Sequence, residues 1–248
     1  MHDKEAYERG LKLGMELGGP AFQQTIDSLR AVDPELVGYL VADGYGKVLS
    51  RGNLSLENRE LCVIAALACR AYLPQLKWHL GAALNIGVAP EAIREVLVQT
   101  QPYAGWPASL NALGTMAATF AERGIVAKPV AASDLSREQL AQRGHENGGR
   151  IYADYGAVEG VVRGYDSELA SYLTENAYGQ VYVRRGEEGT ALRLVSVAIG
   201  VRFVGAGRHW NRARRSLARA IVPRRAIVNG GFRGARLLPA LPGPREDV

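Results

Sequence analysis

The fold is decided by residues 59–123, RELCVIAALACRAYLPQLKWHLGAALNIGVAPEAIREVLVQTQPYAGWPASLNALGTMAATFAER. Their apolar residues recur at helical spacing, and three prolines stand where new helices can begin, since proline is favoured in a first helical turn. These prolines are Pro74, Pro90 and Pro107. Residues 56–71 are apolar around most of the helix circumference, so we expect this helix to be central and buried. Along the last helix we expect one buried stripe, formed by Leu110, Leu113, Ala117 and Phe120.

The segments around this stretch also carry helix signals. Side chains that can cap a first helical turn stand at Asp3, Asp33 and Ser55. Expected helix ends are marked by glycine, at Gly18, at Gly44 with Gly46, and at Gly87. Two short runs, 47–49 and 180–183, are weak strand candidates. The sequence therefore predicts an all-α protein.

The first part of the chain is echoed later at a nearly constant offset. Residues 33–40, DPELVGYL, correspond to residues 166–173, DSELASYL, and residues 45–48, YGKV, correspond to residues 178–181, YGQV. Both matches lie 133 residues apart. Such spacing predicts an internal duplication, and a duplication predicts two similar structural units.

The echo divides the chain into four parts. We expect a first repeat at 1–124, a linker at 125–133, a degenerate second repeat at 134–201 and an Arg-rich tail at 202–248. The second repeat is called degenerate because the offset places Arg212 opposite His79.

The tail differs in charge from everything before it. Through Val201 the chain has 19 Lys and Arg against 23 Asp and Glu, whereas residues 202–248 hold 11 Arg, no Lys and two acidic residues. Three interpretations stay open: a diverged repeat that ends in a partly disordered tail, a shift of the gene's reading frame near residue 202, or a nucleic-acid-binding segment. Arginines neutralise phosphates, but few aromatic residues are interleaved with them, so we disfavour a nucleic-acid partner.

Composition sets the expected compartment. No apolar run approaches the roughly 18–20 residues that a membrane span needs. The charged N-terminus lacks the apolar core of a secretory signal, and two cysteines cannot form a disulfide framework. We expect a cytoplasmic protein without a membrane partner.

Four motifs occur in order in the central stretch: WHLGAALNIGV at 78–88, PEAIREVLVQ at 90–99, YAG at 103–105 and LNAL at 110–113. With them, residues 76–113 resemble the carboxymuconolactone decarboxylase family, within the alkylhydroperoxidase D-like superfamily. The resemblance implies a helical bundle of the alkylhydroperoxidase D type. It also implies a lyase that needs no cofactor or metal and removes CO2 from a small lactone acid of aromatic catabolism.

His79 is the best catalytic candidate. Helical spacing places it beside Leu76 and Leu80, and the alternative is a core histidine bonded to a carbonyl. The resemblance implies an active-site histidine here, and imidazole can donate or accept a proton near neutrality. Glu60 is its expected partner, because a buried carboxylate without a partner is costly. A surface carboxylate stabilised by the helix dipole is the alternative for Glu60.

Three residues are candidates for substrate binding at the border of a pocket: Arg70, Trp78 and Asn85. The alternatives are a solvated arginine, a packing tryptophan and an asparagine that caps a helix.

A peroxidase is a second possible function, because the superfamily contains thiol peroxidases with a CxxC pair followed by a histidine. Aligned on the shared glutamate and histidine, this chain has Tyr72 and Gln75 where those cysteines stand. Cys62 and Cys69 do not replace them, because seven helical residues separate their Cα atoms by roughly 10 Å, beyond the about 7 Å that a disulfide allows. We expect both to be core residues.

A non-catalytic oligomeric scaffold is the third possibility. The family's single-domain members form closed rings of subunits, so a duplicated chain can replace two subunits and give a trimer of pseudo-dimers. The expected partners are a small-molecule substrate and further copies of the chain.

Overall fold

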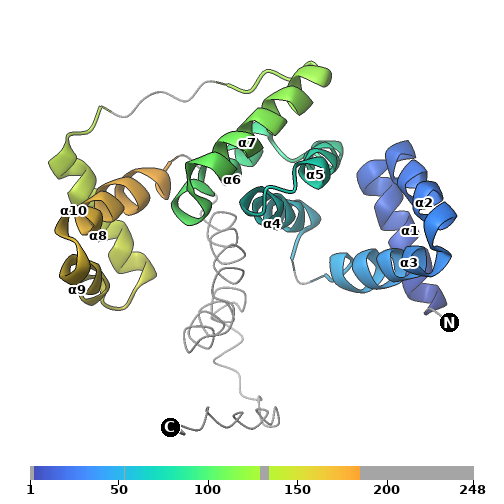
Figure 1. Ribbon diagram of the computed structural model, residues 1–248, viewed down its shortest axis with the longest axis horizontal. Coiled ribbons are helices and arrows are strands. Elements are labelled where there is room, and N and C mark those ends of the chain that lie inside the picture. Colours follow the sequence, from blue (N-terminus) through green and yellow to red (C-terminus); the bar gives the residue numbers. More distant parts are fainter. Residues whose placement is uncertain (1–2, 53, 129–133, 185–248) are drawn as a thin grey trace, which may run out of the picture.

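The computed structural model describes residues 3–52, 54–128 and 134–184 (Figure 1). Every regular element in these ranges is a helix, so the all-α prediction is confirmed and the two strand candidates are wrong. The elements are α1 (Lys4–Gly18), α2 (Pro20–Val32), α3 (Pro34–Gly38), the π-helix η1 (Tyr39–Leu49), α4 (Leu56–Cys69), α5 (Leu73–Asn85), α6 (Pro90–Val98), α7 (Gln101–Glu122), α8 (Arg137–Ile151), α9 (Tyr155–Tyr165), α10 (Ser167–Tyr172) and the π-helix η2 (Leu173–Val181). Among the described residues, no helix has the length and apolar character required to cross a membrane.

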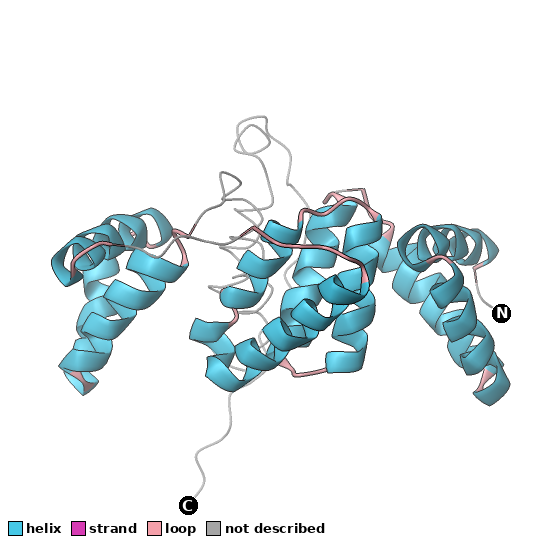
Figure 2. Cartoon of the chain, turned by 90° about the horizontal axis from the view of Figure 1, so that it is seen from above, coloured by secondary structure: helices cyan, strands magenta, loops and turns pink. Residues whose placement is uncertain are grey.

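The helices form three groups. The first contains α1 to α3 with η1, the central group contains α4 to α7, and the third contains α8 to α10 with η2. Figures 1 and 2 show the central group between the other two from both directions. The first group contacts the central one mainly through α1 and α5.

The predicted capping residues all cap helices. The Asp3 carboxylate accepts a hydrogen bond from the backbone of Ala6, and Asp33 accepts two, from Glu35 and Leu36. The Ser55 hydroxyl oxygen accepts one from the backbone of Asn58, at the start of α4. These starts are predictable because each cap depends only on residues within one turn.

The central group contains the larger apolar core. α4 supplies one face of it and packs against α5, α6 and α7. The buried members are Leu61, Ile64, Ala65, Ala68, Leu76, Leu80, Ala83, Val88, Ile93, Val96, Leu97, Ala112, Met116 and Phe120. As predicted, α4 is central to the bundle.

Gly44 and Gly46 do not end a helix, contrary to the prediction. The chain continues through them as η1, and the amide of Ser50 donates to the carbonyl of Tyr45 at 3.0 Å. A Cβ atom on Gly46 would lie 1.8 Å from the carbonyl oxygen of Ala6. Gly46 is therefore a packing residue, which lets the backbones of α1 and η1 touch.

The third group repeats the contacts between α1 and η1. Cβ atoms on Gly144 and Gly179 would each lie 2.1 Å from a backbone carbonyl oxygen of the facing helix. In the first group, Arg9 Nε donates to the carbonyl of Gly46 at 3.4 Å. In the third, Arg143 Nε donates to the carbonyl of Gly179 at 2.7 Å. Helices α8 and η2 thus pack as α1 and η1 do.

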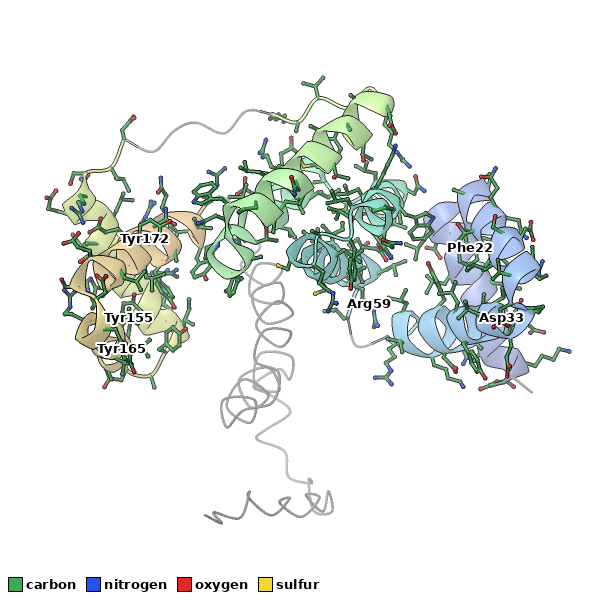
Figure 3. The ribbon with its side chains drawn as sticks, in the orientation of Figure 1. Phe22, Asp33, Arg59, Tyr155, Tyr165 and Tyr172 are labelled. Carbon is green, nitrogen blue, oxygen red and sulfur yellow. The ribbon has the colours of Figure 1, made fainter. Side chains whose placement is uncertain are left out.

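An aromatic pair also recurs in both groups. The rings of Phe22 and Tyr45 lie 5.0 Å apart at 63°, and those of Tyr155 and Tyr178 lie 4.9 Å apart at 63°. Figure 3 labels Phe22 and Tyr155 in their separate groups. The second member of each pair stands in the YG step of the sequence echo.

α7 departs from the predicted pattern. It begins at Gln101 rather than at Pro107, and it bends at Gly105, where φ is 79° and ψ is 173°. Of the stripe expected to be buried, Phe120 is buried but Leu110 is 58% exposed. The inward residues are Ser109, Ala112, Met116, Thr119 and Phe120. Small residues occur on several sides of this helix, so the sequence pattern does not predict which side is buried. Packing against the core determines the buried side.

The third group contacts the start of α7 and the middle of α6. Arg184 Nε lies 3.1 Å from Glu95 Oε2, and Gln101 Nε2 donates to the Tyr172 hydroxyl at 3.4 Å. The rings of Tyr103 and Tyr182 lie 6.0 Å apart. The Arg-rich tail, the end of the second repeat and Arg212 lie outside the described residues.

We expect Gly10→Ala to destabilise the protein by about 3 kcal/mol, because the new methyl group would lie 1.9 Å from the backbone oxygen of Val41 and no rotamer change can relieve that clash. Urea unfolding followed by circular dichroism measures the change. Gly114→Ala is the matched control, since its Cβ meets nothing within 4 Å and should stabilise α7 by about 0.5–1 kcal/mol. Equal stabilities of the two variants would contradict the close backbone contact.

Candidate functional site

Glu60 occupies the second turn of α4, and its side chain is fully buried. Its Oε2 atom lies 2.8 Å from Nδ1 of His79. Its Oε1 atom has no hydrogen-bond partner among the described residues. A buried carboxylate oxygen without a partner costs free energy, because nothing replaces the water that it loses on burial.

His79 reaches Glu60 from α5, and 16% of its side chain is exposed. With the proton on Nδ1, the ring donates to the carboxylate and leaves Nε2 as the atom that can accept or deliver a proton. The carboxylate thereby selects the tautomer and fixes the ring plane. The geometry gives a partly exposed imidazole oriented by a buried acid.

Trp78 of α5 lies beside this pair and connects it to aromatic rings of the first group. The Trp78 ring lies 4.8 Å from the His79 ring at 73°, and Trp78 also contacts Phe22 and Tyr45 at 6.4 Å. Burial, and then the negative charge of Glu60, raise the pKa of Tyr45 above its usual range. The Tyr45 hydroxyl therefore keeps its proton at neutral pH, and it lies close enough to Glu60 to be affected by its charge.

Sequence reasoning did not select Tyr45 for the site. The YG echo singled it out only as a repeat position, because nothing in its local sequence shows that η1 lies across α1 from α5. Tyr45 comes near the pair only through tertiary contacts of α1 with η1 and with α5.

The three candidate substrate-binding residues have different surroundings. Trp78 contacts His79, as described above. Asn85 instead donates to the carbonyl of Leu17 at 2.7 Å and accepts from Arg123 Nη1 at 2.8 Å. Arg70 ends α4, where its guanidinium contacts the Tyr72 ring and donates to the Tyr72 hydroxyl.

Trp78 and Asn85 also line a pocket of about 310 Å³ between α2, α5 and the end of α7. Neither His79 nor Glu60 lines it. The pair and this pocket lie on different faces of α5, so the structure does not gather all five predicted site residues in one cavity.

The two cysteines lie in α4 with free thiols. Burial raises the pKa of each thiol to about 11, and for Cys62 the nearby Arg59 charge opposes the shift only in part. Thiols that stay protonated at neutral pH are poor nucleophiles, which argues against a peroxidase mechanism at these positions.

The chain is similar in sequence to one protein family and to two curated proteins. Residues 34–118 match the model of the Carboxymuconolactone decarboxylase family. This match runs from α3 into α7 and includes both Glu60 and His79.

Two curated relatives are similar to parts of the chain. It is 29% identical over 131 residues to the 4-carboxymuconolactone decarboxylase of Acinetobacter baylyi, across 52% of this chain and 98% of that protein. It is 30% identical over 102 residues to Peroxisomal protein 2 of Saccharomyces cerevisiae, across 38% of this chain and 36% of that protein. The first similarity spans nearly the whole relative.

We expect iodoacetamide to alkylate both thiols about 100-fold more slowly at pH 8 than a free thiol of pKa 9.0, because a pKa of about 11 lowers the thiolate fraction by that factor. Mass spectrometry of timed samples measures the rate. Since the folded-state pKa values are raised, the rate should climb as the pH approaches 11. Alkylation in 6 M urea is the control, and equal rates in folded and unfolded protein would refute the burial of the thiols.

Proposed function

We propose that the chain is a member of the carboxymuconolactone decarboxylase family and acts as a cofactor-independent carboxy-lyase on a small unsaturated lactone acid. One observation carries the proposal: the partly exposed His79 is hydrogen-bonded at 2.8 Å to the fully buried Glu60. The match to residues 34–118 and the similarity to a 4-carboxymuconolactone decarboxylase support the reaction class.

In the proposed reaction, the bond between the substrate carbon and its carboxylate breaks and CO2 leaves. The electron pair moves into the unsaturated lactone, whose carbonyl oxygen becomes the electron sink. Nε2 of His79 first takes up a proton from solvent, and the Glu60 carboxylate stabilises the resulting imidazolium at Nδ1. His79 then delivers the Nε2 proton to carbon and returns to its neutral form. Glu60 is a positioning residue, because it acts on the substrate only through the orientation and tautomer of His79.

We also infer that residues 137–181 are a second copy of residues 4–49. The paired glycine contacts, the matching arginine bonds to Gly46 and Gly179, and the two aromatic pairs support this duplication. The second copy serves as a structural unit, since the proposed catalytic pair belongs to α4 and α5 alone.

We expect His79→Gln to lower kcat by about 10²–10⁴-fold with KM changed less than about threefold, because the variant keeps the shape but loses the proton donor. Glu60→Gln should lower kcat at least about tenfold through loss of the selected tautomer. CO2 release from 4-carboxymuconolactone measures both.

His145→Gln is the matched control, because Nε2 of the exposed His145 lies 2.9 Å from Glu159 in the third group and should leave turnover unchanged. A His79→Gln enzyme as active as the original would exclude the proposed mechanism. Complete inactivity of the original chain on lactone acids would favour the scaffold interpretation.

We propose a homo-oligomer, such as the trimer of pseudo-dimers, assembled partly through α7. Trp106 and Leu110 are each 58% exposed on this helix, which supports a buried role in an assembly. Sedimentation velocity should give several chains per particle and a smaller particle for Leu110→Lys. A monomer at micromolar concentration would contradict the proposal.

A further inference from the structure

A second pocket, of about 270 Å³, lies where α1, the end of η1 and the start of α4 meet. Four of its lining side chains are cationic, one is acidic and four are leucines. They are Arg9, Lys12, Arg51, Arg59, Glu16, Leu13, Leu49, Leu54 and Leu56, and Ser50 completes the wall. Figure 3 labels Arg59 beside the connection between η1 and α4. Neither His79 nor Glu60 lines this pocket.

The three arginines are held in place by successive carbonyl groups at the end of η1. Arg9 Nε donates to Gly46, Arg51 Nε donates to Lys47 at 3.1 Å, and Arg59 Nη1 donates to Val48 at 3.0 Å. Arg59 Nε also donates to Leu54 at 3.0 Å. The guanidinium groups are thus positioned before any ligand arrives, which lowers the entropic cost of binding.

These carbonyls do not balance the charge of the arginines. A helix C-terminus carries about half a negative charge, whereas three arginines bring three positive charges. With Lys12 and Glu16 the lining has a net charge of +3, from four cations and one carboxylate. Burial and then the positive charge of Arg51 lower the pKa of Arg59, so the two guanidinium groups act on each other at close range.

The carboxylates nearby do little to neutralise the pocket. Glu5 lies 3.8 Å from Arg9, but its side chain is 89% exposed, and such surface pairs are weak. In the part of the chain that the structure describes, Lys12 has no ion pair or hydrogen-bond partner. The pocket therefore presents cationic groups beside an apolar wall.

Comparison with the third group shows that helix packing of this kind does not require a cation at the position of Lys12. Arg143 repeats the carbonyl bond of Arg9, so that bond is structural in both groups. Three residues further along the helix, Lys12 of the first group is replaced by Glu146. The same helix position thus carries a carboxylate in the third group, so the positive charge of Lys12 is particular to the first group.

We propose that this pocket binds a small organic acid, with the carboxylate among the cationic side chains and the apolar part against the leucines. Guanidinium groups suit a carboxylate because they offer paired N–H donors in its plane. The site is independent of the proposed function, since it is lined by neither member of the catalytic pair.

Isothermal titration with cyclohexanecarboxylate tests the proposal. We expect saturable binding of one ligand per chain, and binding at least tenfold weaker for the neutral cyclohexanecarboxamide and for inorganic phosphate. Lys12→Glu and Arg51→Gln should each weaken carboxylate binding at least tenfold. Lys4→Glu is the matched control, since it makes the same charge change at an exposed position of α1 outside the pocket lining, and it should change the affinity less than twofold.

His79→Gln should bind cyclohexanecarboxylate as the original does, which separates this site from the catalytic proposal. Absence of saturable binding, or unchanged binding in Lys12→Glu, would overturn the assignment. Equal affinity for the amide would overturn the role of the charge, and equal affinity for phosphate would overturn the role of the leucines. Loss of binding in His79→Gln would move the site to the catalytic pair.

Discussion

Burial of the Glu60 carboxylate is the constraint on which the centre of the molecule depends. A charged group removed from water costs several kcal/mol unless a partner compensates it, and His79 provides the hydrogen bond that does so. α4 and α5 must therefore keep one relative register. The first group is also involved, because its Tyr45 ring packs on Trp78 of α5, and the Trp78 ring in turn packs on His79. The peripheral helices thus help to set the environment of the central pair.

The first and third groups, whose helices pack in a similar way, meet the central group through different contacts. In the first group, α1 packs against α5, and the Phe22 and Tyr45 rings reach Trp78. In the third group, the corresponding rings continue through Tyr182 to Tyr103 at the start of α7. In both groups, glycines let two helix backbones touch, and an aromatic pair lies beside that contact. The two groups differ in what they contact rather than in how they fold.

Local signals in the sequence predicted the helix starts after Asp3, Asp33 and Ser55, because each of these side chains acts on backbone groups within one turn. The prediction from local signals was wrong at Gly46, where the glycine allows a close contact with Ala6 of α1 and does not end a helix. It also failed at Leu110, since a helix rich in small residues offers several faces and packing chooses among them.

For the candidate site too, local signals were predictable from the sequence and contacts between distant segments were not. The partnership of Glu60 with His79 was expected from burial costs and from a family resemblance, and the contact between them is observed. Tyr45 and the basic pocket were missed, because their members come from elements that only the tertiary fold brings together. Charge counts along the sequence place Arg9, Lys12 and Arg51 in a mildly acidic region, and only the fold concentrates the positive charge.

The start of α4 combines two opposite electrostatic demands within two consecutive residues. Glu60 is a buried carboxylate that needs a partner, whereas the positive end of the helix dipole in the first turn opposes the adjacent Arg59. Arg59 offsets that cost by donating to the carbonyl of Val48 at the negative end of η1 and to the carbonyl of Leu54 in the connection before α4. The two side chains project about 100° apart around the helix, so one faces His79 and the other faces the basic pocket. A single helix start thereby anchors a buried acid on one side and a group of cations on the other, and η1 is the element that makes both compatible.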